Sequence, residues 1–282
     1  MGTPPLAATQ EGPTQVRWEY IEHFFVPAGV VCGVSLLVAF LVLHPRLSDL
    51  LFTTLYAKTF AILGYQLLLT YLSCILVVNY ARRLHSMNSP TVASAARGES
   101  VDLKLVPVTR GLILGLFVLQ AVLFLLVLFV GIDHPRIGVP LIGLWSMGTG
   151  SLLGLVLLAH DERAGSAALA ITTLLTVGCG VVGIFSKISF APLGRILFIG
   201  LLLLLLAQVI RLFTRMNTDS RVVALFGSLV FVGYLLFDFQ RLSHLDKAGE
   251  NSWSSALSLA LDIYLDVINL FLYILDLLSK AK

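Results

Sequence analysis

The sequence predicts an all-α membrane protein, a bundle of about eight transmembrane helices with no soluble domain large enough to fold alone. Two observations support this prediction. Of the 282 residues, 57% are hydrophobic and 12% are charged, whereas a soluble domain carries about 25% charged residues. The sequence also holds about eight apolar stretches of roughly 20 residues, the length that a helix needs to cross the hydrocarbon core of a bilayer.

The N-terminal region is predicted to contain a tail and one helix. Residues 1–23 are polar and contain several prolines, as in a flexible tail. Residues 24–43 form the first apolar stretch, which has the length of a full span. A signal peptide would also explain this stretch, but Glu residues outnumber the single Arg17 before it and no small-x-small cleavage site follows. We therefore predict an additional transmembrane helix that is retained.

Residues 50–282 are predicted to form a seven-helix membrane domain. Most of its helices are connected by short polar segments. The exception is residues 80–108, a polar loop that we expect to be mobile and that is too short to be a domain. The predicted spans cover residues 54–79, 111–132, 138–159, 166–185, 194–213, 222–241 and 255–278.

Charge and motif content argue against several classes of protein. The net charge is +3 and the basic residues lie at the ends of apolar stretches, so nucleic acid is not an expected partner. Cys32, Cys74 and Cys179 lie inside apolar stretches at no metal-ligand spacing, and we expect them to be buried apolar residues. The sequence contains no nucleotide-binding, zinc-protease or serine-hydrolase motif. We therefore expect no catalytic residue, no cofactor and no bound metal.

Three aspartates lie inside predicted spans. Most other ionisable side chains, including Lys58 and Arg211, are placed where they can extend to the membrane interface. Asp238, Asp262 and Asp266 are not. A central Asp costs about 2.5–3.5 kcal/mol on insertion scales, so these residues imply a partner, a proton or a water-filled cavity.

The spacing of polar residues predicts that the aspartates share helix faces. Asp262, Asp266 and Asn269 follow one another at intervals of four and three residues, which places them on one stripe of a helix. Tyr234 precedes Asp238 by four residues, so a phenol and a carboxyl group share a face of the preceding helix. If the two stripes face each other, two carboxyl groups meet in a medium of low dielectric constant.

Two roles are open for such a pair. Two close carboxyl groups cannot both be ionised cheaply, so one keeps a proton and the two titrate as a unit. Alternatively, the acids only cross-link the bundle through hydrogen bonds, as polar residues do between membrane helices. Arg136, in the short segment GIDHPRIG, could pair with one of the acids or serve as an anchor at the interface.

Four segments carry a resemblance to one family of membrane proteins. LDIYLDVINLFLYIL is similar to the last helix of that family, and YLLFDFQRL to the end of the helix before it. IFSKISFAPLGRILFIGLLLLLL is similar to its QTKxDFT segment and the Leu-rich helix that follows, with Ser189 in place of the Asp. YAKTFAILGYQLLLTYLSCIL is similar to its first helix. The chain thus resembles the Bax-inhibitor (transmembrane Bax inhibitor motif) family from about residue 50 to 278, with an additional N-terminal helix.

The resemblance implies roles for individual residues. In this family two helix-borne aspartates are understood as a proton-sensitive pair that gates a calcium leak, and the matching positions are Asp238 and Asp266. A basic residue at the end of the family's second helix is thought to latch the pair, and its counterpart is Arg136. The candidates for lining a pore or supporting the pair are Asp262, Asn269 and Tyr234.

Three functions are compatible with this sequence. The first is a pH-regulated calcium or cation leak channel gated by the aspartate pair, with calcium as the permeant ion, that modulates cell death or stress responses. The second is a membrane-embedded interaction protein that regulates apoptosis or stress signalling through protein partners, without conductance of its own. The third is an intramembrane aspartyl protease, which is disfavoured because the sequence lacks a GxGD motif.

The predicted location is a lipid bilayer that the chain crosses several times. This is the bacterial inner membrane, or the endoplasmic reticulum or another endomembrane in a eukaryote. The distribution of Lys and Arg between the loops favours cytosolic termini. The family resemblance instead implies that the loop with Arg136 is cytosolic, so the orientation is left open.

Overall fold

The computed structural model covers seven helices that are long and apolar enough to cross a membrane, counted among the residues that it describes. The prediction of an all-α membrane bundle is confirmed for this part of the chain. The predicted tail, residues 1–23, lies outside the described residues, and so does the predicted extra helix, residues 24–43, apart from Gly33. The described residues are Gly33, 51–86, 92–97, 100–105, 107–160, 162–214 and 220–279.

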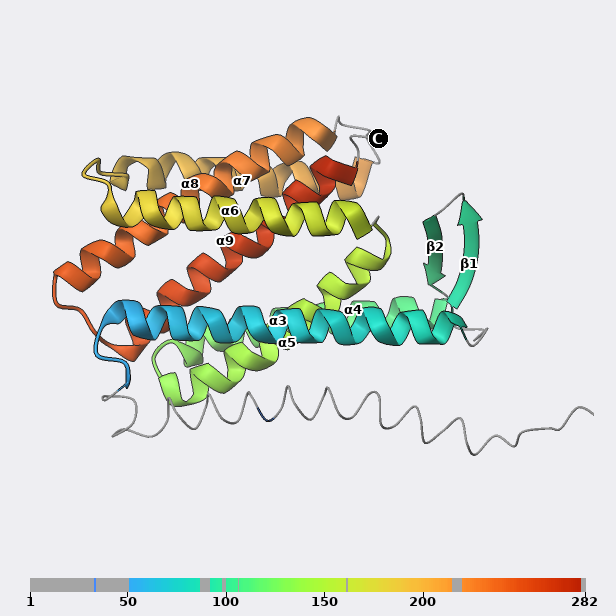
Figure 1. The fold of residues 1–282 in the computed structure, drawn as a ribbon, viewed down its shortest axis with the longest axis horizontal. Coiled ribbons are helices and arrows are strands. Elements are labelled where there is room, and N and C mark those ends of the chain that lie inside the picture. Colours follow the sequence, from blue (N-terminus) through green and yellow to red (C-terminus); the bar gives the residue numbers. More distant parts are fainter. Residues whose placement is uncertain are drawn as a thin grey trace, which may run out of the picture.

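Helices and strands carry the labels of Figure 1. In chain order they are α3 (Leu55–Ser86), β1 (Val92–Arg97), β2 (Ser100–Leu105), α4 (Pro107–Leu126), the π-helical turn η1 (Val127–Gly131), α5 (Pro135–Leu158), α6 (Glu162–Phe185), α7 (Ala191–Thr214), α8 (Ser220–Lys247) and α9 (Trp253–Ser279).

The loop predicted at residues 80–108 is largely ordered secondary structure. Helix α3 continues to Ser86, and strands β1 and β2 form an antiparallel hairpin in which Val92 pairs with Leu105. Residues 92–97 and 100–105 of the predicted loop therefore form two strands. The segment SVDLKL alternates polar and apolar residues, which is a signal of a strand.

Helix α9 lies at the centre of the bundle. Figure 1 shows it running obliquely between α6, α7 and α8 on one side and α3 and α5 on the other. Of the seven spans it is the most buried, whereas α4 and α7 are the least buried. Their exposed residues are mainly Leu, Ile, Val and Phe, as expected of helices that face lipid. Side chains on α9 therefore meet other helices on several sides.

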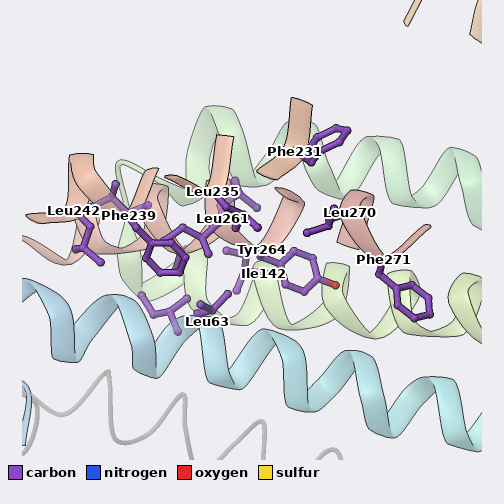
Figure 2. Close-up of a cluster of buried hydrophobic side chains, with 14 of the residues drawn as sticks. Leu63, Ile142, Phe231, Leu235, Phe239, Leu242, Leu261, Tyr264, Leu270 and Phe271 are labelled. Carbon is purple, nitrogen blue, oxygen red and sulfur yellow. The ribbon is translucent and has the colours of Figure 1, made fainter. Parts of the chain in front are cut away.

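The interior around α9 is largely apolar (Figure 2). Tyr264 is fully buried, and its ring packs edge-on against Trp145 of α5 with the ring centres 5.4 Å apart. Its hydroxyl lies 2.6 Å from Oγ1 of Thr70 on α3. This hydrogen bond satisfies both hydroxyl groups and joins α9 to α3 on one side of the central helix.

Helices α3 and α5 pack closely because glycines line their contact. A Cβ atom at Gly150 would overlap the backbone carbonyl of Thr70, and one at Gly154 would lie 2.9 Å from the carbonyl oxygen of Cys74. In lipid, small residues of this kind let helix backbones approach and gain van der Waals contact. The contact between α3 and α5 thus depends on the absence of side chains at these two positions.

The connection between α8 and α9, residues 248–252, is fastened to the start of α3. Lys58 donates a hydrogen bond of 2.6 Å to the Asn251 carbonyl, and its ammonium lies 5.3 Å from the centre of the Trp253 ring. The Asn251 amide donates in turn to the Thr53 carbonyl over 2.8 Å. Lys58 is only 6% exposed. The carbonyl and the aromatic face therefore hold the ammonium group at the end of the span, beside the α8–α9 connection.

Further hydrogen bonds shape the same connection. Helix α8 ends at Lys247, and the chain turns at Gly249, whose φ of +82° suits glycine. The Glu250 amide donates to the Leu245 carbonyl over 3.0 Å. Hydrogen bonds from Ser252 and Ser255 hold the pKa of the Glu250 carboxyl below its usual value. The connection is thus fixed by contacts of its own as well as by α3.

Candidate functional site

Asp238 of α8 and Asp266 of α9 meet inside the bundle. Their side chains are 5% and 6% exposed, and the two carboxyl groups lie within hydrogen-bonding reach of each other. Two carboxylates can only accept hydrogen bonds, so this contact requires a proton on one of the two groups. The arrangement is a buried pair of carboxyl groups that can hold one proton between them.

The helical repeat explains why these carboxyl groups point inward. Asp238 lies one turn after Leu235 and one turn before Leu242, which are both fully buried. Asp266 lies in the same way one turn before Leu270, another fully buried residue. Each aspartate therefore occupies a core position of its helix, and the antiparallel packing of α8 and α9 brings the two positions together.

One oxygen of the pair is enclosed. Oδ2 of Asp266 accepts no hydrogen bond from an N–H or hydroxyl group of the residues that the structure describes. An unsatisfied buried polar atom costs about 1–3 kcal/mol, and a proton shared with Asp238 would lower that cost.

Arg241 and Asp262 form an ion pair next to the two buried acids. The guanidinium Nη1 donates to Oδ2 of Asp262 over 3.1 Å, and the side chains are 45% and 37% exposed. Arg241 follows Asp238 by three residues on α8, and Asp262 precedes Asp266 by four residues on α9. The ion pair thus lies one helical turn closer to the α8–α9 connection than the buried pair does. Sequence reasoning missed Arg241, although the three-residue spacing in DFQR was visible.

Three residues were predicted to line a pore or support the pair, and besides Asp262 these are Tyr234 and Asn269. Tyr234 is half-buried on α8, one turn before Asp238, and is close enough to both Asp238 and Asp266 for an electrostatic interaction. Asn269 donates a hydrogen bond of 2.8 Å to the Leu265 carbonyl of its own helix. The structure therefore brings the phenol to the acidic pair, while the amide is engaged within α9.

Arg136, the predicted latch, lies in the first turn of α5 and is exposed. Within the described residues no ion pair joins it to Asp238 or Asp266. A latching role would require Arg136 to leave this position.

Gln240 fastens the connection between α6 and α7 to α8. Its amide nitrogen donates to the Ile188 carbonyl over 2.6 Å, and its amide oxygen accepts from the Phe190 amide over 2.5 Å. The Gln240 side chain thus pairs with backbone groups on both sides of Ser189. Because Gln240 lies two residues after Asp238, the same stretch of α8 holds this connection and one of the buried acids.

Gln240→Ala should loosen this connection. The substitution removes two hydrogen bonds and leaves a backbone donor and acceptor unpaired, which we expect to cost roughly 2 kcal/mol. Trypsin cleavage after Lys187, which is exposed in the connection, should become several-fold faster in the purified protein. Gln208→Ala, at an exposed glutamine of α7, is the matched control and should cleave like the wild type. Equal rates in all three proteins would show that Gln240 does not hold the connection.

The site holds few of the side chains that bind metals. Among the residues described here, no three or more His, Cys, Asp or Glu side chains are grouped so that they could hold a metal ion. Cys74 and Cys179 are buried free thiols, as predicted, whereas Cys32 lies outside the described residues.

The fold and the site together define a multi-pass α-helical membrane protein with a pair of acidic side chains enclosed between two of its helices. The chain belongs to the family described as inhibitor of apoptosis-promoting Bax1, which it matches over residues 51–282. The resemblance seen in the sequence motifs is thereby confirmed.

Individual relatives come from viruses, animals and bacteria. The chain is 32% identical over 130 residues to the Golgi anti-apoptotic protein of Vaccinia virus (strain Lister), covering 46% of this chain and 53% of the viral protein. It is 32% identical over 123 residues to protein lifeguard 4 of Mus musculus, covering 44% of this chain and 50% of the mouse protein. These two matches span about half the length of each relative. Inner membrane protein YbhL of Escherichia coli (strain K12) is 26% identical over 198 residues, covering 68% of this chain and 84% of YbhL.

Proposed function

We propose that this protein is a pH-regulated cation leak channel, permeable to calcium, in which the Asp238–Asp266 pair controls opening. The observation that supports the proposal most is the burial of the two carboxyl groups within hydrogen-bonding reach, between two helices of the bundle. Buried ionisable groups inside a membrane domain are costly and often mark ion or proton pathways.

The proposed mechanism begins with the shared proton. While one carboxyl group is protonated, a hydrogen bond between the two acids holds α8 against α9 in a closed arrangement. Loss of the proton replaces this attraction by repulsion between two negative charges in a medium of low dielectric constant. The helices then shift to an open arrangement, and the difference in proton affinity between the two arrangements sets how far the equilibrium moves.

The chemistry of the pair suits a hard cation. Calcium prefers carboxylate and carbonyl oxygens as ligands. Two ionised carboxylates facing a water-filled path would attract cations and repel anions. The permeant cation would thus approach the site only after the pair has lost its proton. This proposal assigns the chain no catalytic reaction.

Calcium flux into proteoliposomes tests the proposal. The purified protein is reconstituted with a trapped calcium indicator, and the initial rate of influx is measured at external pH values from 5 to 9. Wild-type flux should rise by about tenfold or more across this range, since opening follows the loss of one proton. Asp238→Asn and Asp266→Asn should each remove the pH dependence, because one ionisable group of the pair is lost.

The control variant is Asp133→Asn, at an exposed carboxyl group between η1 and α5. It removes one acid from the protein but none from the pair, so its pH profile should match that of the wild type. Flux that is the same at every pH and unchanged in both pair variants would rule out the proposal.

A second candidate function is regulation of cell death or stress signalling through membrane protein partners, without conductance. The family description and the name of the viral relative, a Golgi anti-apoptotic protein, favour it. The two functions differ in their dependence on the acidic pair. If Asp238→Asn and Asp266→Asn keep full protection in a cell-death assay while deletion of residues 92–105 abolishes it, the second function is favoured over the channel.

A further inference from the structure

Four charged or ionisable groups lie together at the contact between α8 and α9. Asp238 and Asp266 form the buried pair, and the Arg241–Asp262 ion pair lies one turn closer to the α8–α9 connection. Both members of the ion pair are close enough to Asp238 to act on it electrostatically, and Asp262 also acts on Asp266. The mechanism proposed above makes no use of Arg241 or Asp262.

We propose that the Arg241–Asp262 ion pair sets the pH at which the Asp238–Asp266 pair releases its shared proton. Arg241 and Asp262 are positioning residues in this proposal, since they act through the buried pair. The pH at which the proton is released would in turn determine the pH at which the channel opens, and that part of the inference rests on the proposed function.

The two members of the ion pair act in opposite directions. A guanidinium near the acidic pair favours its ionised state, so it promotes release of the proton. A carboxylate at the same distance disfavours a further negative charge, so it opposes release. While Arg241 and Asp262 neutralise each other, their effects on the buried pair largely cancel. Removal of either charge should therefore shift the pH at which the proton is released. Removal of both charges should bring that pH back to its wild-type value.

Other ionisable groups lie on the surrounding helices. On α8 the Tyr234 phenol faces the acids. Lys58 of α3 is held at Asn251, and the Cys179 thiol of α6 donates to the Val232 carbonyl over 3.8 Å. Tyr65 is buried on α3, and Lys187, Arg195 and Arg136 are exposed in the α6–α7 connection, α7 and α5. Among the described residues, Arg241 is the cation that acts on Asp238.

The alternative is an ordinary surface ion pair. Exposed pairs contribute little to stability because solvent screens them, and both side chains here are more than one-third exposed. This alternative predicts that neither residue affects the buried acids. A measurement of proton release therefore separates the two interpretations.

Infrared titration of the purified wild-type protein in lipid measures the release directly. The C=O stretch of a protonated carboxyl group, identified by its loss in Asp266→Asn, is followed from pH 5 to 9. Arg241→Gln should raise the pH midpoint of this band by roughly 0.5–1 unit, and Asp262→Asn should lower it by a similar amount. The double variant should return close to the wild-type midpoint, which independent effects of general destabilisation would not produce.

Two variants serve as controls. Arg241→Lys keeps the positive charge and should keep the midpoint near that of the wild type. Lys247→Gln removes an exposed charge from the last turn of α8 and should leave the midpoint unchanged. If Arg241→Gln does not fold, the test rests on Asp262→Asn, which should lower the midpoint, and on Arg241→Lys, which should keep it.

The inference is overturned if both single variants keep the wild-type midpoint, if both shift it in the same direction, or if the wild-type band does not titrate. Flux measurements on the same proteoliposomes separate this failure from failure of the proposed function. A band that titrates and shifts as expected, without any calcium flux, supports the setting role of the ion pair and rejects the channel. A pH-dependent flux whose midpoint is unmoved in the variants supports the channel and rejects the setting role.

Discussion

Gly150→Leu should prevent the protein from folding to its native state. A Cβ atom at this position already overlaps the Thr70 carbonyl, which belongs to the backbone of α3 and cannot move aside as a side chain would. Helices α3 and α5 would have to separate along their contact, at a cost of more than about 3 kcal/mol. Expression as a fusion with a fluorescent protein, followed by size-exclusion chromatography in detergent, should show aggregated material in place of a single peak.

Gly178→Leu is the matched control for this steric effect. Gly178 is an exposed residue of α6, and a Cβ atom there would meet no other atom within 4 Å. The same change in volume should therefore leave the chromatographic peak as in the wild type. A single peak for Gly150→Leu as well would show that α3 and α5 do not pack at the observed distance.

The apparent melting temperature of the wild-type protein should fall by several degrees between pH 5 and pH 9. The folded state holds a proton between Asp238 and Asp266 that the unfolded chain releases more readily, so the free energy of unfolding decreases as the pH rises. Two facing carboxylates would reduce this free energy by roughly 2 kcal/mol. Asp266→Asn should remove most of the dependence, because its amide can donate to Asp238 without a shared proton.

Thermal unfolding in detergent, followed by intrinsic tryptophan fluorescence at several pH values, measures this effect without any assay of function. Asp133→Asn, whose carboxyl group is exposed, should keep the wild-type dependence. Identical pH dependence in the wild type and Asp266→Asn would mean that the two acids do not share a proton in the folded state.

The sequence was sufficient for the fold of the described residues. A membrane span can be recognised from the composition and length of an apolar stretch. Such stretches located seven helices to within a few residues at most ends. Helices α3 and α8 were the main exceptions, since they continue to Ser86 and Lys247 where the predicted spans end at residues 79 and 241. Four of the last six residues of α8 are polar, and hydropathy does not report on helix that continues beyond the lipid.

The sequence also located the two central acids of the site. Aspartates at core positions of apolar helices stand out because the bilayer makes them costly. It did not reveal which basic residue lies beside them. Arg241 reaches Asp262 only because α8 and α9 are antiparallel neighbours in one particular register, and a single sequence does not fix that register. The partners of Lys58 escaped prediction for the same reason, since Asn251 and Trp253 are distant in the chain.

The fastening of residues 248–252 to the first turn of α3 limits how α8 and α9 can move apart. With the connection anchored, α8 and α9 can separate only by pivoting about it. Any separation at the two acids is therefore larger at the opposite ends of the two helices. There the ring of Tyr273 on α9 lies against Gly227 of α8, where a Cβ atom would come within 2.6 Å of it. Spin labels placed at that far end would thus register a small displacement of the acids in amplified form.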